Sequence, residues 1–208
     1  VFRTSFGQQF SMPKIANYMR DGVKAKTVGV LWVNNDFGKG GRDTFVKEMA
    51  ARDIKVVADI STESGQADFS ADVVKLKAAN ADAVFVYLNE EESARFLREA
   101  KKQGLNKPMI GETTLLGQKV IDLAGEAANG VRGHVGLTVD APIPAVQAFA
   151  ANFKKRFNYA CDHNGIKGYT AVYFIKHVTE KIGKFDSKAF AQAAHGITIS
   201  PKDEPGIL

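Results

Sequence analysis

The first 140 residues alternate between short apolar runs and stretches in which apolar positions recur with the period of a helix. A β-branched apolar run bounded by glycine or polar residues is typical of a buried strand, whereas a 3.6-residue period indicates an amphipathic helix. The runs predict strands over 27–33, 54–60, 83–88, 108–111 and 131–139. The periodic stretches predict helices over 12–20, 44–51, 90–103 and 118–123, and a further helix that opens at Asp68.

Strands that alternate with helices of this length are joined by right-handed crossovers, which produce a parallel sheet with helices on both faces. We therefore expect an α/β fold. Pro13 is expected in the first turn of the first helix, where its missing N–H is not needed. Ligands of such sheets bind at the carboxyl ends of the strands.

The pattern changes at Asp140, where Ala141-Pro142-Ile143-Pro144 forms a stiff connector. Beyond it the chain has helical periodicity only, with helices predicted over 145–157, 169–182 and 187–194 and a polar loop over 158–168. We expect two parts: an α/β ligand-binding lobe over 1–140, and a connector followed by helices over 141–208.

Composition narrows the class of protein. The 208 residues are 45% hydrophobic, and no apolar run reaches the ~18 residues of a membrane span. The formal net charge is +5, but the basic residues stand among acids on the predicted helices, whereas nucleic-acid-binding proteins cluster theirs on one face. We therefore expect no nucleic-acid partner. The chain starts at Val1 without a leader, so we expect any export signal to have been removed.

Gly38-Lys39-Gly40-Gly41 follows the first predicted strand and invites comparison with a phosphate-binding loop. A dinucleotide loop requires G-x-G-x-x-G, but Asp43 stands where the last glycine is needed, and its charge would repel a pyrophosphate. The Gly-Lys-Ser/Thr of a P-loop is absent as well. The glycines instead indicate a flexible turn that lets the chain approach the helix closely.

Other reactive residue types form no recognisable constellation. Cys161-Asp162-His163 lacks a second ligand pair at metal spacing, so a zinc site is disfavoured. Asp36 resembles the acid of a flavodoxin-like phosphoacceptor, yet no lysine closes the last predicted strand. We expect no catalytic residues, no metal and no cofactor.

A series of short segments runs in a characteristic order along nearly the whole chain: Phe2-Arg3-Thr4 with Gln8, Asn35-Asp36-Phe37-Gly38, Asp68-Phe69-Ser70-Ala71, Ala81-Asp82-Ala83-Val84-Phe85, Phe96-Leu97-Arg98-Glu99-Ala100, Ile110-Gly111-Glu112, Gly130-Val131-Arg132-Gly133 and Tyr169-Thr170-Ala171-Val172-Tyr173. In this order they resemble the periplasmic solute-binding proteins of the leucine/isoleucine/valine-binding type, which serve ABC importers.

The resemblance implies a flavodoxin-like parallel sheet that forms the second lobe of a two-lobe protein, with the helices over 141–208 returning to the first lobe. It also implies that the protein is periplasmic and delivers a small solute, either an amino acid or an aromatic acid or amide, to a membrane ABC permease. A lobe without its partner would expose apolar surface and would be able to associate with itself. Two other classes stay open: a sensory ligand-binding domain of a receptor, and a nucleotide-dependent enzyme on a Rossmann-like sheet.

The candidate ligand-binding residues follow three strand ends. Phe37 takes the place of a cleft tyrosine in the family, and either stacks on a ligand or packs its helix on the sheet. Glu112 matches the acid that faces a ligand ammonium, or else favours a following helix N-terminus. Asn89 or Glu90 supplies a polar ligand contact or caps the next helix, and the hydroxyl of Thr113 serves either role.

Overall fold

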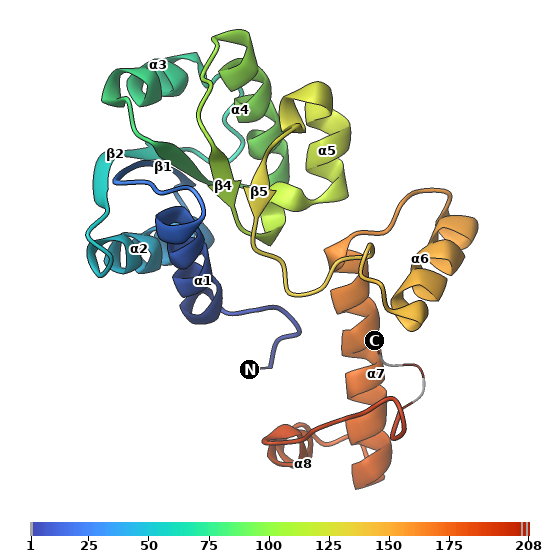
Figure 1. Cartoon of the computed structure of the whole chain (residues 1–208). Helices are drawn as coiled ribbons and strands as arrows, with labels where there is room; N and C mark the ends of the chain where they lie inside the picture. Colours follow the sequence, from blue (N-terminus) through green and yellow to red (C-terminus); the bar gives the residue numbers. More distant parts are fainter. Residues whose placement is uncertain (1, 205, 207) are drawn as a thin grey trace. The chain divides into compact units, whose positions relative to one another are not determined.

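The computed structural model describes residues 2–204, 206 and 208. They separate into two compact units, Phe6–Gly136 and a second one that joins Val1–Ser5 to Leu137–Leu208. We call them the sheet unit and the helical unit (Figure 1). Within the described residues, no helix combines the length and apolar character needed to cross a bilayer.

The sheet unit contains a five-stranded parallel sheet in the order β2-β1-β3-β4-β5. The strands are β1 (Thr27–Val33), β2 (Lys55–Thr62), β3 (Ala83–Tyr87), β4 (Met109–Gly111) and β5 (Arg132–Gly133). The helices are α1 (Gln8–Asp21), α2 (Asp36–Ala50), α3 (Ser70–Ala79), α4 (Glu90–Lys102), η1 (Thr113–Leu116), α5 (Gln118–Ala124) and η2 (Gly125–Ala128). The expected α/β fold with a parallel sheet is confirmed.

Alternating side chains of the central strands build a core on each face of the sheet. In β3, Phe85 and Tyr87 pack against α1 and α2, whereas Val84 and Val86 pack against α3, α4 and α5. Helices therefore cover both faces, as Figure 1 shows. Every residue of β3 is buried, which accounts for its continuous apolar sequence.

The last strand is much shorter than the prediction over 131–139. β5 pairs only with β4, through Ile110↔Arg132 and Gly111↔Gly133. Because β4 ends at Gly111 and turns into η1, the residues after Gly133 have no strand to continue the ladder. The prediction that the strand extends over 134–139, made from the apolar alternation there, was therefore wrong.

Helix α2 begins at Asp36 rather than near residue 44, and the glycines lie inside it. Asn35 is the N-cap, and its side-chain oxygen accepts a hydrogen bond from the Gly38 N–H at 2.8 Å. A Cβ on Gly38 would stand 1.7 Å from the Val33 carbonyl oxygen, and one on Gly41 would stand 2.0 Å from the Tyr87 ring. The prediction of a flexible turn was therefore wrong. The glycines do permit the close approach of the backbone that was expected of them.

Two other helix starts also differ from the prediction. Helix α1 begins at Gln8, so Pro13 lies inside the helix rather than in its first turn. Helix α7 (His163–Ile182) begins six residues before the predicted position. Asp162 caps α7, because its carboxylate accepts a hydrogen bond from the Asn164 N–H at 2.8 Å. Apolar periodicity records neither the Asp162 cap of α7 nor the hydrogen bonds that Gln8, the first residue of α1, makes with Phe37 and Tyr87.

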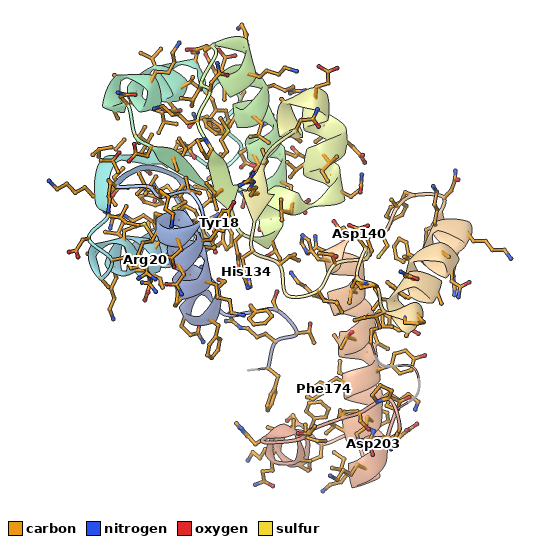
Figure 2. The ribbon with its side chains drawn as sticks, in the orientation of Figure 1. Tyr18, Arg20, His134, Asp140, Phe174 and Asp203 are labelled. Carbon is orange, nitrogen blue, oxygen red and sulfur yellow. The ribbon has the colours of Figure 1, made fainter. Side chains whose placement is uncertain are left out.

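The helical unit contains α6 (Pro144–Phe157), α7 and α8 (Ser187–Ala194). The N-terminal segment belongs to it, because the Phe2 ring lies 6.1 Å from the ring of Phe174 and 5.2 Å from that of His195. The Thr4 hydroxyl also donates a hydrogen bond to the Lys167 carbonyl oxygen at 3.2 Å. Phe174 lies on α7 (Figure 2).

Candidate functional site

The carboxyl ends of β1, β3 and β4 meet at one edge of the sheet unit, where parallel sheets hold their ligands. The first turns of α2 and α4 and the segment from η1 into α5 surround an open hollow of about 460 Å³ there. Its lining residues are Phe37, Asn89, Glu90, Glu91, Glu92, Thr114 and Lys119. The fold thus places residues that follow the ends of three strands around one space.

Phe37 lies in the first turn of α2 and is half-buried. Its ring stacks on Tyr87 with centroids 4.3 Å apart and an interplanar angle of 21°. The stack continues into the core, because Tyr87 lies 5.4 Å from Phe85, and Phe85 lies 3.9 Å from Phe45. The ring therefore both lines the hollow and packs the helix on the sheet.

Glu112, the N-cap of η1, is only 7% exposed and does not line the hollow. Its carboxylate is near enough to the Tyr87 hydroxyl to act on the pKa of that group. Burial, followed by the negative charge of Glu112, raises the pKa of Tyr87 above its ordinary value. Gln8 completes this cluster, since its Nε2 donates to the Tyr87 hydroxyl and to the Phe37 carbonyl oxygen, each at 3.0 Å.

Asn89 and Glu90 start α4 at the rim of the hollow. Asn89 is the N-cap, yet its side chain bonds no backbone N–H and instead donates from Nδ2 to Glu92 at 2.9 Å. Glu92 is buried, and its Oε1 also accepts the Gly65 N–H at 2.7 Å. Burial alone would raise the pKa of Glu92, but the hydrogen bonds from Gly65 and Asn89 outweigh burial, so the pKa is lowered.

Ion pairs hold the outer rim. Lys119 of α5 lies 2.8 Å from Glu91, and Arg95 lies 3.4 Å from the other oxygen of the same carboxylate. The hydrogen bond from Lys119 and its positive charge lower the pKa of Glu91. These exposed pairs join the start of α4 to α5 and contribute little free energy individually.

The structure gathers some predicted site residues and separates others. Phe37, Asn89 and Glu90 line the hollow, whereas Thr114 takes the place there that was expected for Thr113. Sequence reasoning missed Gln8, Tyr87 and Lys119. A tyrosine that closes an otherwise apolar buried strand was the available signal, because a buried hydroxyl needs a partner.

Neither a metal site nor a reactive pair is evident elsewhere in the described part of the chain. No group of three or more His, Cys, Asp or Glu side chains within it has the spacing to hold a metal ion. Cys161 is buried, and burial raises the pKa of its thiol, which lowers its nucleophilicity. His163 lies 3.2 Å from Lys167 on the same helix.

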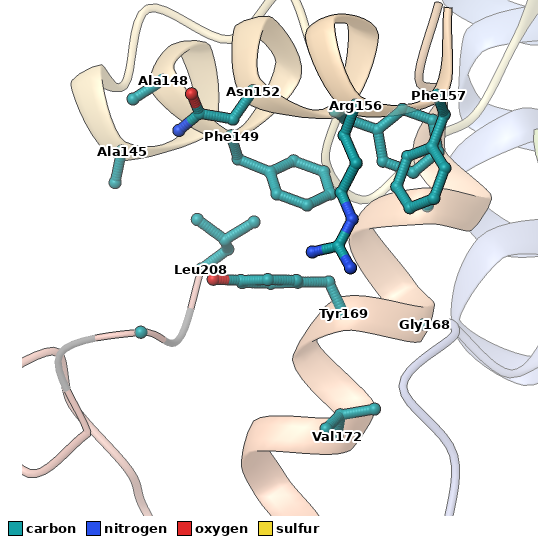
Figure 3. Close-up of a pocket in the computed structure, with 13 residues that line it drawn as sticks. Ala145, Ala148, Phe149, Asn152, Arg156, Phe157, Gly168, Tyr169, Val172 and Leu208 are labelled. Carbon is teal, nitrogen blue, oxygen red and sulfur yellow. The ribbon is translucent and has the colours of Figure 1, made fainter. Parts of the chain in front are cut away.

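The helical unit has a different kind of concavity, of about 560 Å³, between α6 and α7. In Figure 3 the Phe149 ring and the Arg156 side chain point toward Tyr169. The Phe149 and Tyr169 rings lie 4.6 Å apart, and Val172 is 64% exposed beside them. Aromatic and aliphatic side chains dominate this surface, in contrast to the charged rim in the sheet unit.

Comparison with known proteins identifies the family. The periplasmic binding protein family matches residues 1–205, so the chain belongs to the periplasmic binding proteins. Its relatives place it with the leucine/isoleucine/valine-binding type, which confirms the resemblance seen in the sequence. One relative is the leucine-, isoleucine-, valine-, threonine- and alanine-binding protein of Pseudomonas aeruginosa, 27% identical over 96% of this chain and 53% of its own length.

Solved structures share the fold. A solute-binding protein of an ABC transporter from R. palustris, in complex with benzoate, superposes with a TM-score of 0.87 at 20% identity, covering 96% of this chain and 55% of its own. The branched-chain amino acid transporter substrate-binding protein of Streptococcus pneumoniae, in complex with isoleucine, superposes with a TM-score of 0.81 at 22% identity. The match covers 91% of this chain and 54% of the S. pneumoniae chain. The chain therefore spans about half the length of the relatives it matches.

Proposed function

We propose that this protein captures a small solute, an amino acid or a related compound, and delivers it to an ABC importer of the bacterial membrane. Membership of the periplasmic binding family and a hollow at the carboxyl edge of the sheet support this function. On this proposal the protein is exported and works in the periplasm. The names of its relatives include both branched-chain amino acid and benzoate binders, so both solute classes are candidates.

Each candidate residue has a defined part in this proposal. Phe37 packs against the body of the solute, because its ring lines the hollow and is held flat by Tyr87. Asn89 or Glu90 adds a polar contact from the start of α4. Glu112 and Thr113 lie outside the lining of the hollow, and their proposed parts are to pair with an ammonium group of the solute and to contribute a hydroxyl, respectively.

The sheet unit is one lobe of the complete protein in this proposal. The helical unit belongs with a second lobe that residues outside this chain supply, and those residues cover the apolar surface between α6 and α7. A large exposed apolar surface typically marks an interface. The two lobes close around the solute by a hinge motion.

The experiment uses the complete two-lobe protein in a thermal-shift screen against amino acids and aromatic acids. A solute of one class should raise the melting temperature. Glu112→Gln should weaken the binding of an amine-bearing solute by roughly tenfold or more, since a hydrogen bond to a charged group is worth about 1.5–3 kcal/mol. The matched control is Glu126→Gln on η2, because the Glu126 carboxylate pairs only with the exposed side chain of Lys101 on α4 among the ion pairs of the described residues. No shift with either class would contradict the proposed function.

A further inference from the structure

A second pocket of the sheet unit lies between α1 and the edge strand β5 and has a volume of about 350 Å³. Residues of α1, β4 and β5, together with His134, line it, and none of them lines the hollow at the carboxyl edge of the sheet. The polar side chains among them are Lys14, Tyr18, Arg132 and His134, whereas no Asp or Glu lines the pocket. The fold therefore gathers positive charge here without a carboxylate beside it.

The register of the sheet brings Arg132 to α1. Arg132 of β5 pairs with Ile110 of β4, and residues paired across neighbouring parallel strands project from the same face. Ile110 belongs to the core on the α1 side, so the Arg132 side chain leaves the sheet on that side as well. Its Nη1 donates a hydrogen bond to the hydroxyl oxygen of Tyr18 on α1, and its Cζ lies 5.9 Å from the centroid of the Tyr18 ring (Figure 2).

The polar groups that face each other across this pocket are hydrogen-bond donors. A guanidinium only donates, so the Tyr18 oxygen accepts from Arg132 and the proton of the Tyr18 hydroxyl remains for another acceptor. Lys14 lies over the ring of Phe6, with its Nζ 5.4 Å from the ring centroid. Neither Lys14 nor Arg132 forms an ion pair with a carboxylate of the described residues. The donors of the pocket therefore outnumber its acceptors.

His134 adds a further polar group to the same wall. Its Nδ1 is buried and has no hydrogen-bond partner among the described residues, although buried polar groups of proteins are almost always hydrogen-bonded. Burial, followed by the positive charge of Lys14, lowers the pKa of His134. The charge of Lys14 therefore acts on His134, and no acid of the pocket compensates it.

We propose that this pocket binds a small monocarboxylate, with the carboxylate held by Lys14, Tyr18 and Arg132 and the apolar body of the ligand against Ile15 and Ile110. A carboxylate offers only acceptors, so it matches a site whose free polar groups are donors, and an arginine fork binds it through two parallel N–H bonds. Inorganic phosphate would leave the apolar part of the lining uncovered. The inference does not depend on the proposed function, because the pocket and the hollow share no lining residue.

The first test locates the ligand by NMR in this 208-residue chain, with hexanoate as the probe. Hexanoate should cause saturable shifts of the amide signals of Tyr18, Arg132 and His134, and none at Asn89 and Glu90 of the hollow. Hexanamide, which has the same length and no charge, should bind at least about tenfold more weakly, because charge-assisted hydrogen bonds are lost. Inorganic phosphate should also bind more weakly than hexanoate.

Two outcomes of this test would overturn the proposal. One is the absence of shifts at Tyr18, Arg132 and His134 up to about 50 mM hexanoate, a concentration that reveals even weak binding of a small ligand. The other is equal affinity for hexanoate and hexanamide, or for hexanoate and phosphate, because either equality would remove the charge or the apolar contact from the site.

The second test removes the donors one at a time. Arg132→Gln and Lys14→Gln should each raise the dissociation constant of hexanoate by about fivefold or more, since each loses a charge that faces the carboxylate. Arg20→Gln is the matched control, because Arg20 is an exposed arginine on α1 that pairs with Asp21 at 2.8 Å. It should leave the affinity unchanged within about twofold.

Melting temperatures of the three variants are compared, and if Arg132→Gln does not fold, Lys14→Gln decides. An equal loss in Arg20→Gln would show a general effect of net charge and overturn the site. The amide signals of Arg132 and His134 should also respond to hexanoate in the complete two-lobe protein. If they do not respond there, the proposal is wrong, whether or not the thermal-shift screen finds a solute for the hollow.

Discussion

At the scale of single residues, glycine and aromatic side chains shape the candidate site together. Gly41 of α2 lets the Tyr87 ring lie against the helix, and Tyr87 in turn supports the Phe37 ring at the hollow. The sequence Gly38-Lys39-Gly40-Gly41 resembles a phosphate-binding loop, yet its glycines serve packing. Their role depends on what lies opposite each Cα, which a motif does not contain.

Substituting Gly41 with alanine should destabilise the sheet unit by about 1–3 kcal/mol, because an added Cβ would overlap the buried Tyr87 ring. Gly168, inside α7, is the matched control, since nothing lies within 4 Å of its Cβ position. Gly168→Ala should leave stability unchanged or raise it by up to about 1 kcal/mol. Urea unfolding measures both variants, and equal stability of Gly41→Ala and the unsubstituted protein would contradict the packing argument.

At the scale of elements, a single carboxylate joins the starts of two neighbouring strands. Asp82, just before β3, accepts the backbone N–H groups of Lys26 and Thr27, both at 2.8 Å, and the Thr27 hydroxyl at 3.0 Å. The hydrogen bonds from Lys26 and Thr27 lower the pKa of Asp82. The carboxylate thereby aligns the amino ends of β1 and β3, which pair along their length.

The contribution of Asp82 should depend on pH. Because its pKa is lowered in the folded protein, the stabilisation is present above the unfolded pKa of about 4 and is lost as pH falls through the folded value. Asp82→Asn should therefore reduce the free energy of unfolding by roughly 1 kcal/mol at neutral pH, with solvent screening limiting the effect, and by much less near pH 3.

Urea unfolding at several pH values checks this expectation. Asp140→Asn, at an exposed aspartate just before the connector, is the control and should have little effect at any of these pH values. A stability difference for Asp82→Asn that stays constant from neutral to acid pH would count against the proposed role of its charge.

At the scale of the whole molecule, the chain spans about half the length of the relatives it matches. The hollow in the sheet unit is open, and its charged rim lies at one edge of a single sheet. Solute sites bury most of the ligand surface, which one wall cannot do. We therefore regard the candidate site as one side of a cleft.

The isolated 208-residue chain should accordingly bind amino acids and aromatic acids only weakly, with dissociation constants of about 1 mM or higher. Isothermal titration of this chain and of the complete two-lobe protein, with the same solutes, makes the comparison. Micromolar affinity of the isolated chain for a free amino acid would contradict this expectation, because it would show that the sheet unit binds solute without a second lobe.

The sequence alone determined the α/β fold, the parallel orientation of the strands and the positions of the central strands. Buried strands such as β3 and amphipathic helices such as α4 leave strong local periodicity, because each buries a continuous face. Only the tertiary structure decided the early start of α2, the short β5 and the partnership of Gln8 with Tyr87. Those features depend on contacts between residues far apart in the chain, and such contacts leave no period in the sequence to follow.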